Sequence, residues 1–270
     1  MKHATRRMKP LLGTFVEVGS ACPSAQDSPA FDAAFSAIEQ IHNLLSFHNP
    51  QSDLSRLNYS FGNEVELHPH SLRVLRLAKA MSCASDGLFN PTVGGKLQSL
   101  GYLPDHSSYF QSSEIPLPIG EAFDIQMRRK KVFLARPVRV VLDGIAKGYA
   151  VDLAIKALKQ AGLSNGWVNA GGDIRVYGDV VLPLQIRGPE GLGETLGGLQ
   201  NMSVATTWVK DVYDQSFPGW VVLGDRKPAL GVWTVLAKKA WRADALTKVA
   251  SLAFPEERAE IMARLGGRCL

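Results

Sequence analysis

The chain has 270 residues, is 46% hydrophobic and carries a formal net charge of +5. This is the composition of a globular protein with a large buried core, and it excludes a disordered or fibrous chain. Lysine and arginine are spread along the sequence without the aromatic-flanked basic stripe of a nucleic-acid surface, so we expect small anionic ligands and no nucleic acid.

The three cysteines, Cys22, Cys83 and Cys269, lie far apart and form no C-x-x-C pair. This spacing argues against a disulfide framework or a structural zinc site and favours a reducing compartment. No apolar run approaches the roughly 18 to 20 residues that span a bilayer, so we expect no membrane span.

The N-terminal segment resembles an export signal, because basic residues precede the apolar run Pro10–Val18. Gly13 and Glu17 interrupt that run, and Thr14, Val16 and Val18 alternate with the residues between them as in a strand. We therefore interpret the segment as the first strand and expect a cytoplasmic protein.

The next hundred residues read mostly as helices. Apolar residues at helical spacing predict a helix that begins at Asp27-Ser28-Pro29 and ends near Ser46. A loop with a short helical turn capped by Ser52 follows, and Ser71 is expected to cap a second helix ending at Asp86-Gly87.

The segment Leu88–Gly95 is predicted to be a rigid turn, because one proline and two glycines fix its backbone. Such a turn can approach a planar ligand closely, or it can simply close the preceding helix. The sequence alone leaves both interpretations open.

The centre of the sequence is Val138–Leu142, a predicted strand, followed by Asp143-Gly144 and a helical pattern that reaches Gly162. A strand that enters a helix through a glycine turn directs backbone N–H groups and the helix dipole at one spot, which suits a phosphate. Lys147 adds a positive charge there. The alternative is an ordinary turn with a solvated lysine.

Further strands are expected along the second half, and the Gly171-Gly172 pair is either a hairpin turn or a place where the backbone touches a ligand. No repeat or linker divides the sequence, so we predict a single domain over residues 1–270. The other predicted strands are Phe123–Met127, Lys131–Leu134, Gly166–Ala170, Ile174–Tyr177, Leu182–Arg187, Met202–Thr206, Trp220–Leu223 and Val232–Leu236.

Near the C-terminus, Asp244 suits the start of a helix, and Thr247 and Lys248 fall on the same face. Carboxylate and hydroxyl oxygens are hard donors that fit Mg²⁺, which also takes phosphate oxygens from a substrate. The alternative is an N-capping aspartate with a surface ion pair to Lys248.

Several of these stretches occur in the same order in the FAD:protein FMN transferases, the ApbE-like flavin transferases, which the chain resembles from about residue 10 to 254. The family pattern has M-G-T, S-x-Y-x-P-x-S-x-L-S-R-L-N, G-x-F-D-P-T-V-G, G-I-A-K-G-Y-A-V-D, V-N-x-G-G-D, I-x-x-P and A-D-A-L-x-T. Each motif is short, but their combination in this order is specific. The corresponding residues are Leu12-Gly13-Thr14, Ser46–Asn58, Gly87–Gly94, Gly144–Asp152, Val168–Asp173, Ile186–Pro189 and Ala243–Lys248.

The resemblance implies an α+β fold, a single domain of mixed sheets and helices with the flavin site between two halves. It also implies Mg²⁺-dependent transfer of FMN from FAD to a threonine hydroxyl of a target protein, with release of AMP. In such a displacement at phosphorus, positioning and charge neutralisation do most of the catalysis.

By position, Gly144 would offer a backbone oxygen to the metal, and Asp244 and Thr247 would supply side chains. Lys147 would share the diphosphate charge with the metal, and Asp173 would orient or deprotonate the incoming hydroxyl. The residues that would line the flavin nucleotide are Leu12, Phe47, Leu88, Phe89, Asn90 and Lys147.

The chain departs from the family pattern at several of these positions. Val141 stands where the family has aspartate, while Asp143 directly precedes the glycine. Asn90 replaces an aspartate, which keeps the shape and loses the charge, and Phe47 replaces a tyrosine, which keeps the aromatic face.

Two further departures concern the end of the pattern. Lys248 takes the place of the family threonine, so either Thr247 ligates the metal or Lys248 takes over part of its role. The family segment H-I-I-D-P-x-T-G corresponds to 220–227, and no histidine follows His106. Losing a histidine that assists proton transfer costs about 10²- to 10⁴-fold in rate.

Three hypotheses therefore remain from the sequence. The chain is an FAD:protein FMN transferase, or an FAD-binding protein that has lost transfer and serves as a carrier or regulator, or a small-molecule phosphotransferase or FAD pyrophosphatase.

Overall fold

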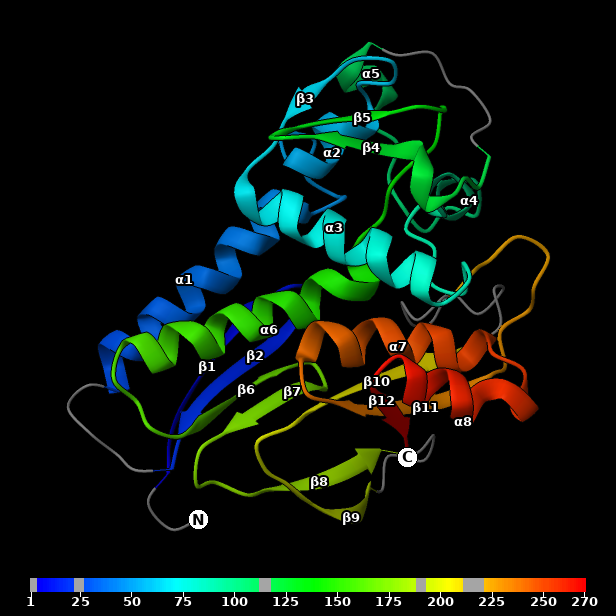
Figure 1. The fold of residues 1–270 in the computed structure, drawn as a ribbon. Helices are drawn as coiled ribbons and strands as arrows, with labels where there is room; N and C mark the ends of the chain where they lie inside the picture. Colours follow the sequence, from blue (N-terminus) through cyan, green and yellow to red (C-terminus); the bar gives the residue numbers. More distant parts are fainter. Residues whose placement is uncertain (1–3, 22–26, 112–117, 188–192, 211–220) are drawn as a thin grey trace.

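The computed structural model describes residues 4–21, 27–111, 118–187, 193–210 and 221–270. Its base is a seven-stranded sheet in the order β1-β2-β6-β7-β10-β11-β12, in which every neighbouring pair is antiparallel (Figure 1). The strands are β1 Thr5–Leu11, β2 Thr14–Ser20, β6 Gly166–Ala170, β7 Asp173–Tyr177, β10 Ser203–Val209, β11 Gly231–Ala237 and β12 Gly267–Cys269.

The two faces of this sheet are covered differently. Helices α6 and α7 lie across one face, with α1 beside α6, and the β8–β9 hairpin lies on the other (Figure 1). Successive side chains of β6 point to opposite faces of the sheet. Val168 joins the main core, while its neighbour Trp167 packs in a smaller core with Leu184 and Leu199 of the hairpin. The bounds are α1 Asp27–Leu45, α6 Asp143–Gln160, α7 Ala240–Leu252, α8 Pro255–Arg264, β8 Leu182–Arg187 and β9 Gly193–Leu199.

A second layer lies above α6 in Figure 1 and contains a small three-stranded sheet in the order β3-β5-β4. The main hydrophobic core joins both layers, since it includes Val16 of the large sheet, Phe35 of α1, Ile125 of the small sheet and Leu246 of α7. The elements of this layer are α2 Asp53–Asn58, β3 Val65–Glu66, α3 Pro69–Ala84, α4 Gly94–Ser99, α5 Ser107–Phe110, the 3₁₀ turn Ala122–Asp124, β4 Ile125–Arg128 and β5 Lys131–Leu134.

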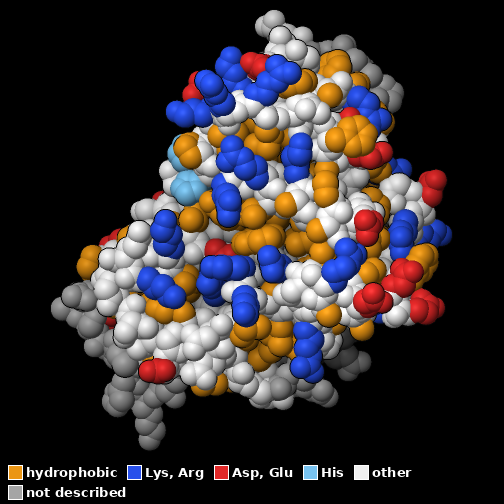
Figure 2. All heavy atoms as spheres, viewed as in Figure 1, with side chains coloured by type: hydrophobic (Ala, Val, Ile, Leu, Met, Phe, Trp, Pro, Cys, Tyr) orange, Lys and Arg blue, Asp and Glu red, His pale blue; other side chains and the backbone are white. Residues whose placement is uncertain are grey.

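The predicted α+β class is confirmed, as are the helix from Asp27 and the strands Lys131–Leu134, Gly166–Ala170 and Leu182–Arg187. Among the described residues, no helix is long and apolar enough to cross a membrane. Lys and Arg side chains are scattered among hydrophobic ones on the face seen in Figure 2 and form no single stripe.

The predicted strand Val138–Leu142 is wrong, although the segment is extended. Only Arg139 makes a bridge, to Val93, and the other backbone groups find different partners. The buried Asn58 amide donates to the Val140 carbonyl at 2.8 Å and accepts from the Val140 N–H at 2.7 Å, while the Val141 N–H donates to the carbonyl of Pro91 at 2.7 Å. A side chain and a loop thus take the place of a neighbouring strand.

The expected glycine turn into the central helix is also wrong. Helix α6 begins at Asp143, so Gly144 lies inside its first turn. The second helix begins at Pro69 with His68 as its N-cap, and Ser71 instead donates its hydroxyl to Asp53 at 2.7 Å.

Other differences are confined to the ends of elements and to segments without a clear pattern. The predicted strand Phe123–Met127 begins only at Ile125, after a 3₁₀ turn. Trp220 lies outside the described residues, and Val221–Leu223 forms no strand beyond an isolated bridge from Leu223 to Arg226. No prediction was made for β1, β3, β9, β12 or α8.

Candidate active site

A cavity of about 1000 Å³ opens between the two layers, at the upper end of the range for ligand sites. Its upper wall comes from Ser46–Asn49 and from the turn before α4, and its lower wall from the β1–β2 turn, the start of α6 and Lys248 of α7. The structure brings all six residues predicted to line a flavin nucleotide to this cavity: Leu12, Phe47, Leu88, Phe89, Asn90 and Lys147.

The turn between β1 and β2 places Leu12 at the cavity. It has two residues, Leu12 with φ +55° and Gly13 with φ +69°, as a hairpin of this length requires. A positive φ is uncommon for leucine and marks local strain, which tends to occur where a side chain has a binding role.

Asn90 lines the cavity, and its side chain stabilises the turn in which it lies. Its amide donates to the Gly120 carbonyl at 2.9 Å, and its carbonyl oxygen accepts from the backbone N–H and the hydroxyl of Thr92 at 2.8 and 2.7 Å. These bonds occupy its polar atoms, so Asn90 shapes the wall on which Phe89 and Leu88 are carried. An aspartate could not make the first of these bonds.

The floor of the cavity depends on a close crossing of α6 and α7. A Cβ added at Gly148 would lie 2.4 Å from the Ala240 carbonyl oxygen, so only glycine permits this approach. The crossing brings the buried Asp244 to α6, where one carboxylate oxygen accepts the Gly148 N–H at 3.1 Å.

Asp152 holds the same crossing from its other side. Its carboxylate accepts the backbone N–H groups of Ala240 and Trp241, both at 3.2 Å, and forms an ion pair with Arg175. These two N–H groups belong to the first residues of α7, where backbone N–H groups lack partners within the helix and favour a negative charge. Asp152 closes the motif that begins at Gly144, but no role was predicted for it from the sequence.

Lys147, which lines the cavity, forms an ion pair with the buried Asp173. The lysine projects from the first turns of α6, and Asp173 is the first residue of β7, directly after the Gly171-Gly172 turn. Their charged atoms Nζ and Oδ2 lie 3.3 Å apart, and this carboxylate oxygen is buried and makes no hydrogen bond within the described residues.

Burial raises the pKa of Asp173 from its ordinary value to about 7, against the attraction of Lys147. The negative charge of Asp173 in turn raises the pKa of Lys147, which stays an ammonium at neutral pH. The pair therefore combines a fixed positive charge with a carboxyl group that titrates near neutrality, which is the property of a general base or acid.

Asp143, which directly precedes Gly144, opens onto the cavity at the start of α6. Asp143 is exposed to the cavity, and its carboxyl group lies among the charges of His48, Asp244, Lys248 and Lys147. The carboxylate predicted to be displaced along the chain in fact belongs to the same charged cluster as the two lysines.

Lys248 sits one helical turn after Asp244 and lines the cavity. Its ammonium lies 2.5 Å from Asp244 Oδ1, 3.1 Å from the Asp244 carbonyl oxygen and 3.3 Å from the Thr207 hydroxyl. The Thr247 hydroxyl is buried and lies 2.7 Å from both the Asp244 carbonyl oxygen and the Thr207 hydroxyl. The predicted shared face of Asp244, Thr247 and Lys248 is confirmed, but as an ion pair in a cavity wall rather than on the surface.

The residues predicted to hold Mg²⁺ do not fit that ion in this arrangement. Mg²⁺ requires free oxygens at about 2.0–2.1 Å. Both carboxylate oxygens of Asp244 are already engaged, one by Lys248 and one by Gly148, and the Thr247 hydroxyl is engaged as well. Across the described ranges, no group of three or more His, Cys, Asp or Glu side chains is arranged to hold a metal.

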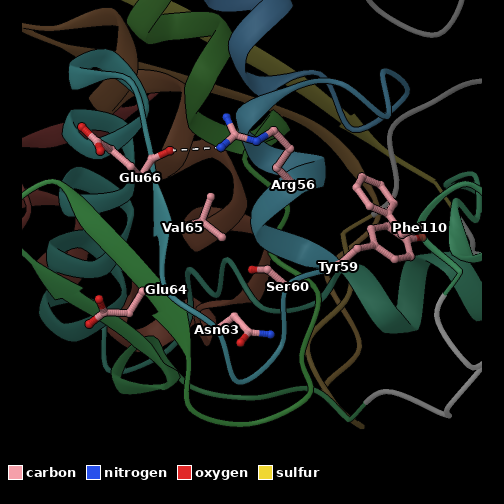
Figure 3. A pocket seen from close by; sticks show the side chains of 8 residues that line it. All are labelled: Arg56, Tyr59, Ser60, Asn63, Glu64, Val65, Glu66 and Phe110. Atoms are coloured by element: carbon pink, nitrogen blue, oxygen red, sulfur yellow. Dashed lines mark hydrogen bonds between the residues drawn. The ribbon is translucent and has the colours of Figure 1, made fainter.

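A second hollow, of about 400 Å³, lies in the upper layer (Figure 3). One side of it carries Tyr59 stacked on Phe110 at 4.7 Å between ring centroids, and Arg56 donates to the Glu66 carbonyl at 3.4 Å. No residue predicted for the site contributes to it, so it is not the candidate active site. Its lining is Arg56, Tyr59, Ser60, Asn63, Glu64, Val65, Glu66 and Phe110.

Comparison with known proteins identifies the same family that the sequence motifs resemble. The sequence profile of the ApbE family matches residues 12–209. An FAD:protein FMN transferase of Rhodobacter capsulatus is 30% identical over 178 residues, covering 63% of this chain and 34% of that protein. One from Haemophilus influenzae is 25% identical over 195 residues, covering 65% and 56%. The chain thus matches between a third and just over half of the length of these relatives.

Solved structures share the fold. The flavinyl transferase ApbE of Pseudomonas stutzeri, in its apo form, superposes with a TM-score of 0.79 at 20% identity, covering 97% of this chain and 88% of that one. The ApbE protein of Thermotoga maritima gives 0.80 at 21% identity, covering 99% and 94%.

Proposed function

Since the chain belongs to the ApbE family, we propose that it transfers FMN from FAD to a threonine hydroxyl of an acceptor protein and releases AMP. The observation that carries the proposal is the make-up of one cavity. Hydrophobic side chains such as Phe89 form one part of its wall, and the Lys147 ammonium stands on its floor 3.3 Å from the buried Asp173. A flavin suits the former, and a diphosphate suits the latter.

The reaction is a displacement at the FMN phosphorus. The threonine oxygen forms a bond to that phosphorus, the bond from phosphorus to the bridging diphosphate oxygen breaks, and AMP leaves with the bridging oxygen. FMN remains on the acceptor as a phosphodiester, and one proton is released from the threonine hydroxyl. Asp173 accepts this proton, because its pKa of about 7 lets it be ionised before the reaction and protonated after it.

Lys147 acts on the charge of the reacting group. Its ammonium stabilises the negative oxygens of the diphosphate and the charge that develops on the leaving AMP. Asp244 does not offer a free oxygen to the Mg²⁺ that the family resemblance implies, because Lys248 and the Gly148 N–H occupy its carboxylate oxygens.

Covalent flavin on a protein tests the proposal directly. The purified chain is incubated with FAD and an extract that supplies acceptor proteins, and the products are separated under denaturing conditions. We expect a fluorescent protein band, a threonine with the mass gain of FMN, and AMP release that depends on the extract.

Two other results would each replace this proposal. Tight FAD binding without AMP release would identify a flavin carrier, which the missing histidine after His106 favours as the second candidate. Release of AMP together with free FMN, independent of any acceptor, would identify an FAD pyrophosphatase.

A further inference from the structure

The strongest unexplained feature of the cavity is the Lys248 ammonium. It is held by three oxygens, two from Asp244 and one from Thr207, at 2.5 to 3.3 Å. The side chain is 21% exposed, so the cation is fixed by the protein and still faces the cavity. An ammonium without a partner in this position would lose hydration with no compensation, whereas here Asp244 supplies the countercharge.

The position of Lys248 coincides with the predicted metal set. Asp244 and Thr247 precede it on α7, and a Cβ added at Gly144 would lie 3.3 Å from Lys248 Cε. The lysine side chain therefore lies against Gly144 and Asp244, two of the three residues expected to surround Mg²⁺. In the family pattern this position is a threonine, so one substitution exchanges a potential oxygen ligand for a tethered positive charge.

Hydrogen-bonding capacity favours the same conclusion. Two ammonium groups, those of Lys147 and Lys248, line the cavity that would hold the diphosphate of a dinucleotide. An ammonium donates up to three hydrogen bonds, so Lys248 can keep Asp244 and still donate to a phosphate oxygen.

We propose that Lys248 occupies the place of the divalent cation, so that this chain binds the diphosphate of its dinucleotide without a metal. The inference rests on the proposed function for the identity of the dinucleotide, FAD. It concerns which cation the site uses and does not require that transfer be measured.

The first test measures FAD binding by flavin fluorescence, in EDTA and in millimolar Mg²⁺. We expect the wild-type affinity to be the same in both. Lys248→Thr should weaken binding in EDTA by on the order of tenfold or more, and Mg²⁺ should restore it. Lys248→Met should show the same loss without the recovery, because it supplies no oxygen.

Lys238→Thr is the matched control, since Lys238 is exposed just before α7 and does not line the cavity. It should bind FAD as the wild type does under both conditions. Thermal unfolding of each variant shows whether a loss of binding reflects a loss of folding.

A second test leaves FAD out and follows Mn²⁺ binding by electron paramagnetic resonance. Lys248→Thr should bind Mn²⁺, and the wild type should not. If the wild type binds no FAD at all, the proposed function fails, and this experiment still decides the role of Lys248.

Several results would overturn the inference. They are wild-type FAD binding that is lost in EDTA, Mn²⁺ binding that is equal in the wild type and Lys248→Thr or absent from both, and FAD affinity in EDTA that Lys248→Met leaves unchanged. A Lys248→Thr variant that binds FAD weakly with and without Mg²⁺ would likewise show that ammonium and metal are not equivalent here.

Discussion

Two lysine–aspartate pairs place their ammonium groups at the same cavity, and they differ in how many hydrogen bonds their carboxylates make. In the pair within α7, Asp244 receives Lys248 at 2.5 Å and the Gly148 N–H at 3.1 Å. In the pair between α6 and β7, Lys147 stands 3.3 Å from an oxygen of Asp173 that makes no hydrogen bond within the described residues.

This difference indicates a separate role for each pair. Both carboxylate oxygens of Asp244 are engaged, so its partners hold this group in place. Burial raises the pKa of Asp173 to about 7, so this carboxyl group exchanges its proton near neutrality. The α7 pair therefore suits a structural and binding role, and the α6–β7 pair suits proton transfer.

The largest effect is expected from Asp173→Asn, which keeps the shape and removes the base. Below pH 7 the wild-type Asp173 is increasingly protonated and cannot accept the threonine proton, so the rate should rise as the pH increases through about 7. The variant should lose about 10²- to 10⁴-fold in turnover and this pH dependence with it. AMP release between pH 5.5 and 8.5 measures both.

The exposed Asp179, just after β7, provides the control variant Asp179→Asn, which should keep the wild-type profile. A pH profile that survives in Asp173→Asn would assign the titrating group elsewhere, and Asp143 would then be the nearest alternative in the cavity.

Lys147→Met should reduce turnover on the order of 10²-fold, because it removes a charge from the developing negative centre. It should also move the pH profile to higher pH, because in the wild type the charge of Lys147 lowers the pKa of Asp173 and the variant lacks this charge. The measurement is the rate of AMP release at saturating FAD across the same pH range. Lys156→Met, at an exposed position of α6, is the matched control, and an unshifted profile in Lys147→Met would contradict the coupling of this pair.

Gly148→Ala should disturb the crossing of α6 and α7, on which the position of Asp244 depends. The added Cβ would lie 2.4 Å from the backbone oxygen of Ala240, which cannot move without shifting α7. We expect a loss of about 1–3 kcal/mol in the free energy of unfolding, measured in urea.

Gly144→Ala provides the comparison on the same helix. Its Cβ would meet only the flexible end of Lys248 and the ring of Phe89, both at 3.3 Å, and alanine favours the helix. Its unfolding free energy should change by less than about 1 kcal/mol. Equal losses in the two variants would refute the steric explanation.

Asn90→Asp should have the smallest effect, although it restores the residue of the family pattern. The carboxylate cannot donate to the Gly120 carbonyl, so we expect a loss of about 1 kcal/mol in stability. Turnover should fall slightly, because the new charge opposes a diphosphate in the same cavity. Thermal unfolding measures the stability, and AMP release measures the turnover. Unchanged stability together with higher turnover would show that the wall tolerates a carboxylate here and that the reaction uses it.

Much of the local structure followed from the sequence, because its causes are local. Helix α1 was predicted from apolar spacing and from Pro29 in its first turn. The pairing of Asp244 with Lys248, four residues apart, was the alternative to a metal site, expected on the surface at the start of a helix. The Gly171-Gly172 turn was predicted as a hairpin or a ligand contact, and it both joins β6 to β7 and lines the cavity through Gly171.

The errors arose where a backbone partner came from far along the chain. Val138–Leu142 has the composition of a strand, but its partner is the side chain of Asn58, 82 residues away from Val140. Strand β1 was missed because its charged residues hide the alternation, as is common for strands at a sheet edge.

The sequence by itself determined the family, the α+β class and several charged residues of the candidate site, among them Lys147 and Asp244, since each depends on short motifs and on periodicity. Only the tertiary structure decided how these charges divide into pairs. Gly148 meets Asp244 across 96 residues because two helices cross without a side chain between them. That approach satisfies Asp244. At Asp173, burial, which no local pattern encodes, sets the pKa near neutrality.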